Sequence, residues 1–277
     1  MVWSISRDLS LKCWDLNSAK CLHTVEEAHS LNLSSITVNE EGTNVASGSR
    51  DYSVKVWDVE KLGTVLNQYK LPRNIVTCLQ FGKGSSNGDG KHLLYQGSED
   101  LAVRVWDIRQ PDNQSAPCQV FSQYVYFPLC MDIHDNTMVT GTKGFNSVGC
   151  EVKVWDVRNN AQPVHNLTGH SQDVTDCCLF NDMRIVSISK DGTIGMFDAL
   201  SGETIKWSNV GMGGRHVFTS LAKNFHTNVS TGDVQMLSVS TFDGALHRIQ
   251  VDGTDDLGDN LLAIKFSTSA HYNDDEE

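Results

Sequence analysis

The sequence lacks the features of a membrane-spanning, secreted or nucleic-acid-binding protein. No apolar run approaches the roughly 20 residues that a membrane-spanning helix needs. The first residues read directly as a strand, so a signal peptide is not expected. Acidic residues outnumber basic ones by 34 to 22, which gives a net charge of −12. This balance disfavours binding to nucleic acid and docking on an anionic membrane, because both need basic surface.

The sequence also lacks the spacing of a metal or redox site. Its eight cysteines are scattered, and no C-x-x-C pair is present. Several of them fall on predicted strands, where small apolar residues are expected, and such reduced thiols indicate an intracellular protein. No metal and no cofactor are therefore predicted.

Motifs of catalysis are missing as well. There are no paired carboxylates and there is no nucleophile elbow. The Gly-rich stretch 82–90 is not followed by a helix pattern and is not closed by a Lys-Ser or Lys-Thr pair, so it is interpreted as a flexible surface loop rather than a phosphate-binding loop. We therefore predict no catalytic residue and do not expect an enzyme.

A short apolar segment that ends in Trp-Asp recurs along the whole chain. Clear copies lie at 11–15, 54–58, 103–107 and 152–156, and less regular copies lie at 194–198 and 246–250. Successive copies are 43, 49, 49, 42 and 52 residues apart, measured at the aromatic position or its replacement. A period of this size with a terminal Trp-Asp is typical of the four-stranded blade of a β-propeller.

The residues around each copy have a common pattern. Val54-Lys55-Val56 alternates apolar and polar residues, which predicts a strand with one apolar and one polar face. A turn with an aspartate, such as Ser49-Arg50-Asp51, comes just before it. Further upstream, a histidine lies in a loop at His29 and again at His170.

This pattern resembles the WD-repeat family over nearly all of the chain. In that family the loop histidine, the turn aspartate, a strand serine or threonine and the tryptophan form a hydrogen-bonded network inside each blade. For the second blade the resemblance implies a network of His29, Asp51, Ser47 or Ser49, and Trp57. Because the His and Asp recur at fixed places in a repeat, a structural role is favoured over catalysis.

The resemblance implies incomplete networks in other blades. In the fifth blade the members are His170, Asp191 and Ser187 or Ser189, and Phe197 replaces the tryptophan. Trp106 and Trp155 stand at the tryptophan position of the third and fourth blades, which lack the loop histidine. Each buried hydrogen bond contributes about 0.5–1.5 kcal/mol, so partial loss is tolerable when neighbouring blades still pack.

The predicted fold is an all-β WD-repeat β-propeller that forms one domain at 1–266, followed by an acidic polar tail at 267–277. The first blade, at about 1–25, has three strands because its innermost strand is missing. Five complete blades follow, at about 33–69, 75–121, 126–167, 173–207 and 217–266. Because a ring must close to leave no open sheet edge, we expect an N-terminally incomplete form of a seven-bladed ring, unless something else fills the gap.

Two connections are longer than the repeat requires. They are 143–151, which contains Phe145, and the Gly-rich 208–216, which contains Arg215. In a propeller both lie on the same face, so this face is predicted to bind the partner.

Two successive blades end in Trp-Asp-x-Arg, which places Arg109 and Arg158 just after the strand. This resembles the paired Asp-x-Arg box of substrate receptors of cullin-type ubiquitin ligases, whose two arginines face the ligase adaptor. A solvated surface cation is the simpler interpretation.

These observations predict a non-catalytic protein-interaction scaffold, because a rigid ring leaves its connections free to vary. The stretches 72–79, 96–100 and 144–151 also resemble a cilium-associated branch of the WD-repeat family. That resemblance implies ciliary transport or axonemal partners, in the cytoplasm and the cilium or flagellum. A substrate receptor of a cullin-type ubiquitin ligase is the alternative.

Overall fold

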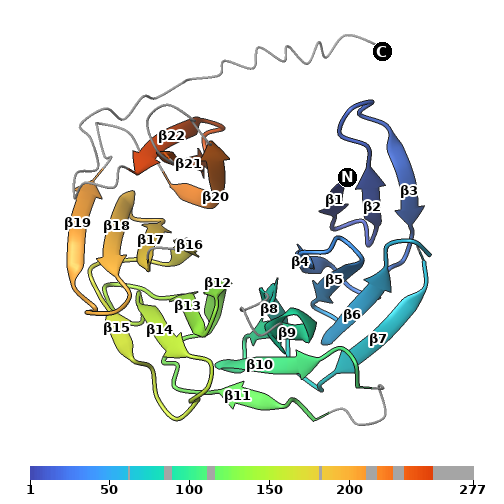
Figure 1. Ribbon diagram of the computed structural model, residues 1–277, viewed down its shortest axis with the longest axis horizontal. Helices are drawn as coiled ribbons and strands as arrows, with labels where there is room; N and C mark the ends of the chain where they lie inside the picture. The colour runs from blue at the N-terminus through green and yellow to red at the C-terminus, as the bar shows by residue number, and fades with distance from the viewer. Residues whose placement is uncertain are drawn as a thin grey trace.

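The computed structural model describes residues 1–61, 63–83, 89–110, 116–180, 183–209, 217–226 and 234–251. Within this part the chain forms six antiparallel sheets of consecutive strands, and the helical structure is one short 3-10 turn, η1 (Asp89–His92). The sheets follow one another around a common centre in chain order (Figure 1). None of the described helical structure is long and apolar enough to cross a membrane. The predicted all-β propeller is confirmed.

Each sheet is one blade, numbered here in chain order. The first contains β1 (Val2–Ile5), β2 (Leu11–Trp14) and β3 (Cys21–Val25). The second contains β4 (Leu33–Val38), β5 (Asn44–Ser49), β6 (Ser53–Asp58) and β7 (Val65–Lys70). The third contains β8 (Val76–Phe81), β9 (Leu93–Ser98), β10 (Ala102–Asp107) and β11 (Gln119–Phe121).

The remaining blades follow the same order. The fourth contains β12 (Pro128–His134), β13 (Thr137–Thr142), β14 (Val152–Asp156) and β15 (His165–Leu167). The fifth contains β16 (Val174–Leu179), β17 (Arg184–Ser189), β18 (Thr193–Asp198) and β19 (Thr204–Asn209). The sixth contains β20 (Phe218–His226), β21 (Val234–Thr241) and β22 (Leu246–Val251).

Some predictions concern residues beyond these strands. The fourth strand expected for the sixth blade, before residue 266, and the acidic tail at 267–277 lie outside the described residues. A seven-bladed ring stays a prediction, because it concerns a blade beyond these six.

Both sides of a blade are packed, although the Trp-Asp strands alternate apolar and polar residues. Val54 and Val56 of β6 pack against β8 and β9 of the next blade. Trp57 points the other way and packs with Leu11 of the first blade. The expected polar side of β6 is therefore also covered, and Lys55 reaches past Trp57 to donate a 2.6 Å hydrogen bond to the Ala28 carbonyl. Long side chains bury their stems in this way while the charged end finds a polar partner.

The inner strands of the second to sixth blades contact one another around the centre: β4 with β8, β8 with β12, β12 with β16, and β16 with β20. A side chain on one inner strand accepts a backbone hydrogen bond from the next inner strand at three of these junctions. The pairs are Ser35 with Leu79 N at 2.9 Å, Asp132 with Leu179 N at 2.9 Å, and Asp176 with Leu221 N at 2.8 Å. These bonds join neighbouring sheets in addition to the apolar contacts between them.

The strand order assigns every connection to one of two faces. Because neighbouring strands are antiparallel, the turns between the second and third strands of each blade lie at the same end as the connections that lead into the inner strands. We call this end the Asp-turn face, because it carries Asp51 and Asp191. The turns that follow the Trp-Asp segments lie at the other end, which we call the Trp-Asp face.

Candidate functional site

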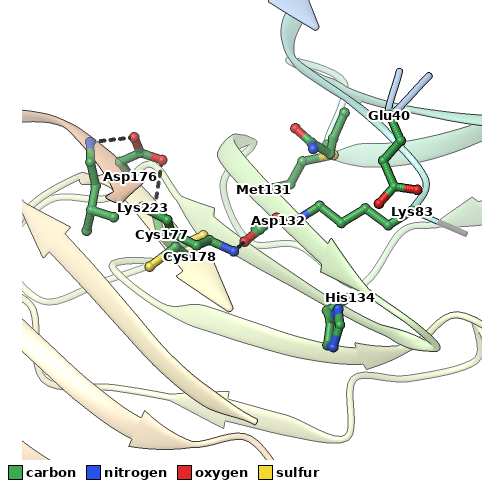
Figure 2. Close-up of a pocket in the computed structure, with 11 residues that line it drawn as sticks. Glu40, Lys83, Met131, Asp132, His134, Asp176, Cys177, Cys178 and Lys223 are labelled. Carbon is green, nitrogen blue, oxygen red and sulfur yellow. Dashed lines mark hydrogen bonds and ion pairs between the residues drawn. The ribbon is translucent and has the colours of Figure 1, made fainter. Parts of the chain in front are cut away.

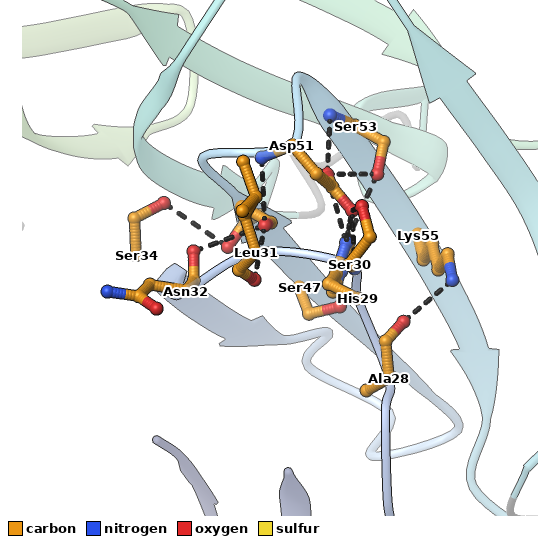
Figure 3. Close-up of polar contacts among 12 residues, drawn as sticks. Ala28, His29, Ser30, Leu31, Asn32, Ser34, Ser47, Asp51, Ser53 and Lys55 are labelled. Atoms are coloured by element: carbon orange, nitrogen blue, oxygen red, sulfur yellow. Dashed lines mark hydrogen bonds and ion pairs between the residues drawn. The ribbon is translucent and has the colours of Figure 1, made fainter. Parts of the chain in front are cut away.

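The second blade contains a complete buried network around His29 (Figure 3). His29 Nδ1 lies 3.1 Å from Asp51 Oδ2, and its Nε2 lies 2.8 Å from Ser47 Oγ. Trp57 Nε1 donates to the same Ser47 oxygen at 2.8 Å. Of the two candidate serines, Ser47 is therefore the network member. Ser49 Oγ instead donates to the carbonyl of Leu31, at 2.9 Å.

The charges of this network are internally satisfied. Burial raises the pKa of Asp51, but hydrogen bonds from His29, Ser53 and the Ser30 amide outweigh it and hold the pKa well below the usual range. The ring of His29 is 1% exposed and both of its nitrogens have partners. A histidine enclosed in this way holds a blade together and is not presented to a substrate.

The fifth blade has a related network without the tryptophan. His170 Nε2 lies 2.7 Å from Ser187 Oγ, and His170 Nδ1 lies 2.7 Å from Thr193 Oγ1. Thr193 donates in turn to Asp191 Oδ1 at 2.5 Å, which leaves Asp191 at 3.8 Å from the histidine.

Aromatic packing takes the place of the missing indole hydrogen bond in this blade. Phe197 has no N–H to donate, and the ring of Trp207 instead packs 4.7 Å from the ring of His170. Trp207 also makes an edge contact with Phe197 at 6.0 Å. Ser189, the other candidate serine, donates to the Gln172 carbonyl at 3.3 Å.

The third blade replaces the histidine with amide side chains. Trp106 Nε1 donates to Gln96 Oε1 at 2.7 Å, and Gln96 Nε2 donates to Ser98 at 3.3 Å. With its amide nitrogen turned toward Ser98, Asn74 donates to Ser98 Oγ at 3.0 Å and to Asp100 at 3.2 Å. A chain of hydrogen bonds thus runs from Trp106 to the turn aspartate, Asp100, without a histidine.

The fourth blade uses a tyrosine for the same purpose. Trp155 Nε1 donates to Thr140 Oγ1 at 3.4 Å, and the Tyr124 hydroxyl lies 3.1 Å from the same oxygen. Burial raises the pKa of Tyr124, so the hydroxyl keeps its proton. Sequence reasoning missed Asn74, Gln96 and Tyr124 because none of them is a repeat residue. The available signal was their position, directly before or on the first two strands of blades that lack the histidine.

Arg109 and Arg158 lie on the Trp-Asp face in nearly identical settings. Each guanidinium pairs with the aspartate two residues earlier, Asp107 or Asp156, through contacts of 2.9 Å at Nε and 2.7 Å at Nη2. These arginines hold the pKa of both carboxyl groups below the usual range. The Arg109 and Arg158 side chains remain 60% and 70% exposed, so this part of the face offers two outward-facing ion pairs.

The connection 143–151 presents apolar side chains from a fixed backbone on the Asp-turn face. Phe145 N donates to the Val148 carbonyl at 3.0 Å, and Gly144 N donates to Asp173 of the neighbouring blade at 2.9 Å. Phe145 is nevertheless 67% exposed and Val148 54%. Burying such side chains against a partner is favourable, and a pre-ordered loop loses little entropy on binding.

Arg215 and most of 208–216 lie outside the described residues.

A charged cluster that the sequence analysis did not single out lines a hollow of about 540 Å³ (Figure 2). Asp132 of β12 accepts from Lys223 of β20, from the Leu179 amide of β16 at 2.9 Å, and from Lys83, which follows β8, at 3.2 Å. Burial raises the pKa of Asp132, but both lysines and the amide bring it below its usual value. One carboxylate thus joins four blades.

Asp176 lies in the same hollow and has different chemistry. Its pKa is raised because burial outweighs the hydrogen bonds from Leu221 N, Cys177 N and Ser220. Among the described residues, no three His, Cys, Asp or Glu side chains are gathered in a way that would hold a metal ion. All eight cysteines are free thiols.

Comparison with known proteins agrees with this geometry. The WD domain, G-beta repeat pattern matches residues 19–58 and 161–198. Each match starts near the outer strand of one blade and ends at the third strand of the next, so the repeat unit is offset from the blade.

Curated relatives share roughly a quarter of their residues with this chain. F-box/WD repeat-containing protein 9 of Homo sapiens is 28% identical over 180 residues, which cover 62% of this chain and 36% of that protein. E3 ubiquitin-protein ligase COP1 of Arabidopsis thaliana is 29% identical over 160 residues, which cover 58% of this chain and 22% of that protein. The matched part therefore spans about a third or less of the length of these relatives.

A solved structure shares the fold. The crystal structure of RRP9 WD40 repeats superposes with a TM-score of 0.74 at 19% identity, covering 90% of this chain and 72% of that one. Together with the six blades and the two matched repeats, this shows that the chain has the all-β WD40 β-propeller fold and contains segments that match the WD domain, G-beta repeat.

Proposed function

We propose that the chain is a non-catalytic protein-interaction scaffold that binds a partner on its Asp-turn face. The observation that carries the proposal is the exposure of Phe145 and Val148 on a loop whose backbone is hydrogen-bonded to its own blade and to the next. Large apolar side chains at the centre of an interface contribute most of its binding energy. The enclosed histidines of the second and fifth blades favour a scaffold over an enzyme.

The partner is tested by proximity labelling in ciliated cells with the wild-type chain and a Phe145→Asp, Val148→Asp variant. We expect the variant to lose the strongest labelled partners while it keeps its fold, as measured by circular dichroism. A Lys20→Glu, Lys61→Glu variant, which adds more negative charge but on the Trp-Asp face, is the control. An unchanged set of partners in the Phe145→Asp, Val148→Asp variant would contradict the proposal.

The finer proposal is a ciliary role. The stretches 72–79, 96–100 and 144–151 resemble WD repeat-containing protein 31, which implies a cytoplasmic and ciliary or flagellar scaffold for intraflagellar transport or cargo recruitment. Two of these stretches contain Asn74 and Gln96, the residues that rebuild the network of the third blade. The same labelling experiment tests this proposal, and a partner set without ciliary transport or axonemal proteins would refute it.

The second candidate function is a substrate receptor of a cullin-type ubiquitin ligase. It is supported by the matched, exposed ion pairs of Arg109 and Arg158 and by the similarity to an F-box/WD repeat-containing protein and an E3 ubiquitin-protein ligase. In this reading the arginines face the ligase adaptor. Purified adaptor should bind the wild-type chain and lose binding to an Arg109→Ala, Arg158→Ala variant. Adaptor that fails to bind the wild-type chain would remove this candidate.

A further inference from the structure

One position recurs on the Asp-turn face in every blade. It is the first residue of the turn between the second and third strands. In the second to sixth blades its backbone N–H donates a hydrogen bond of 2.9–3.0 Å to the carbonyl just before the inner strand. The residues at this position are Arg7, Arg50, Glu99, Lys143, Lys190 and Phe242, and all six are exposed. Because the same backbone bond fixes this position in five blades, these side chains start from equivalent points around the ring.

Four of these six residues are basic, on a chain whose net charge is −12. Arg7 and Arg50 line a hollow of about 310 Å³ together with Glu99 and Phe127. The Lys143 ammonium lies 4.9 Å from the centre of the ring of Phe127, one of the residues that line the hollow. The charged residues that line this hollow are two arginines and one glutamate, so its lining has a net positive charge.

Three of the four cations of this group have no carboxylate partner among the described residues. Within the described part of the chain, Arg7, Arg50 and Lys143 form no ion pair. Lys190 is the exception, because it contacts Asp173 at 2.6 Å. On the Trp-Asp face, by contrast, the two exposed arginines are each neutralised by a neighbouring aspartate.

Apolar surface lies beside these cations. Phe145 and Val148 follow Lys143 in the same connection, and Tyr126 is 38% exposed. Tyr126 packs so closely on Gly149 that a Cβ there would lie 2.1 Å from the tyrosine ring. The aromatic ring and the apolar loop thus form one surface next to the basic group.

We propose that this surface recognises an acidic peptide segment that carries an apolar residue, a conclusion that rests on the scaffold function proposed above. Carboxylates of such a segment would pair with Arg7, Arg50 and Lys143, and its apolar residue would pack on Phe145. Charge interactions are screened beyond about 8 Å at physiological salt. A short segment bound here therefore interacts with the nearby cations and little with the acidic remainder of the molecule. A long polyanion or a membrane would also meet the acidic remainder of the molecule.

The proposal is tested with a random peptide library displayed on phage and selected on the purified chain. We expect the enriched sequences to contain an excess of aspartate and glutamate around an apolar residue. A synthetic enriched peptide should then bind an Arg50→Glu, Lys143→Glu variant about tenfold more weakly or worse in fluorescence anisotropy, with a stronger effect at low salt. The Lys20→Glu, Lys61→Glu variant has the same net charge and should bind the peptide as the wild type does.

Several results would overturn the proposal. The first is a selection that enriches no sequences, or only neutral and basic ones. The second is a peptide affinity that the Arg50→Glu, Lys143→Glu change leaves unaltered. The third is stronger competition by a DNA oligonucleotide or phosphatidylserine vesicles than by the peptide. If any of these occurs while the Phe145→Asp, Val148→Asp change still removes partners in cells, the scaffold function stands and only the acidic specificity fails. If that change leaves the partners intact, the scaffold function itself fails.

Discussion

Loss of the Ser47 hydroxyl should destabilise the second blade. Its hydroxyl is fully buried, accepts a hydrogen bond from Trp57 Nε1 at 2.8 Å and lies 2.8 Å from His29 Nε2. A Ser47→Ala change leaves an indole N–H and an imidazole nitrogen buried without partners. Each unsatisfied buried group lowers the free energy of unfolding by about 1–3 kcal/mol. For the two groups together, with partial relaxation of the surrounding side chains, we expect a loss of about 3 kcal/mol.

The effect is measured by urea and thermal unfolding, followed by tryptophan fluorescence and circular dichroism. A loss of about 3 kcal/mol lowers the Tm by roughly 5–10 °C in a chain of this size. Ser18→Ala is the matched control, because Ser18 is exposed and bonds only to Asp15 on the surface. It should change the free energy of unfolding by less than about 0.5 kcal/mol.

A double-mutant cycle separates the network from the general effect of altering a core residue. If Ser47 and Trp57 interact as the structure shows, Ser47→Ala should cost about 1 kcal/mol less in a Trp57→Phe background than in the wild type. Equal costs in both backgrounds, or a Ser47→Ala protein as stable as Ser18→Ala, would refute the reasoning.

Three further predictions concern pH, backbone strain and thiol reactivity. Because the pKa of Asp51 is lower in the folded chain than its ordinary value of about 3.9, its stabilisation is present above that pH and declines as the pH falls below it. An Asp51→Asn variant should therefore be less stable at neutral pH and show a shallower acid decline in a fluorescence titration; parallel curves would contradict this. Gly149→Ala should lower the free energy of unfolding in urea by roughly 2 kcal/mol or more, because Gly149 has a φ of +74° and Tyr126 occupies the space of a Cβ. Gly42 has a φ of +67° but open space around it, so Gly42→Ala should lower the free energy of unfolding by about 1 kcal/mol. Alkylation followed by mass spectrometry should modify exposed Cys21 well before buried Cys78, since burial raises the pKa of Cys78 to about 12; equal rates in the folded chain would contradict this.

The propeller could be predicted because its signals repeat. The spacing of Trp14, Trp57, Trp106 and Trp155 reflects one strand position in four blades, and each of these side chains donates a hydrogen bond to a polar residue of the neighbouring strand or its equivalent. A signal that occurs several times is readable from one sequence, even where a copy such as Phe197 has diverged.

Contacts that occur once could not be predicted. Lys223 meets Asp132 across 91 positions of sequence, and the pairing exists only because β20 and β12 both face the centre of the ring. Asn74 and Tyr124 take the place of a histidine with different side-chain chemistry, so the repeat pattern does not predict them. The basic group on the Asp-turn face lies between these cases, because Arg7, Arg50 and Lys190 stand in turns that the repeat identifies, but their exposure and pairing depend on the folded chain.

The offset between repeat and blade has an evolutionary and practical consequence. A unit such as 19–58 supplies the outer edge of one sheet and most of the following sheet, so duplicating it copies a finished junction together with the new blade. A cut at the boundary of a unit separates a sheet from its own outermost strand, whereas a cut between blades leaves every sheet whole. Truncated fragments of this molecule should therefore end at blade boundaries. A fragment that ends at a repeat boundary exposes an unpaired strand edge, which promotes aggregation.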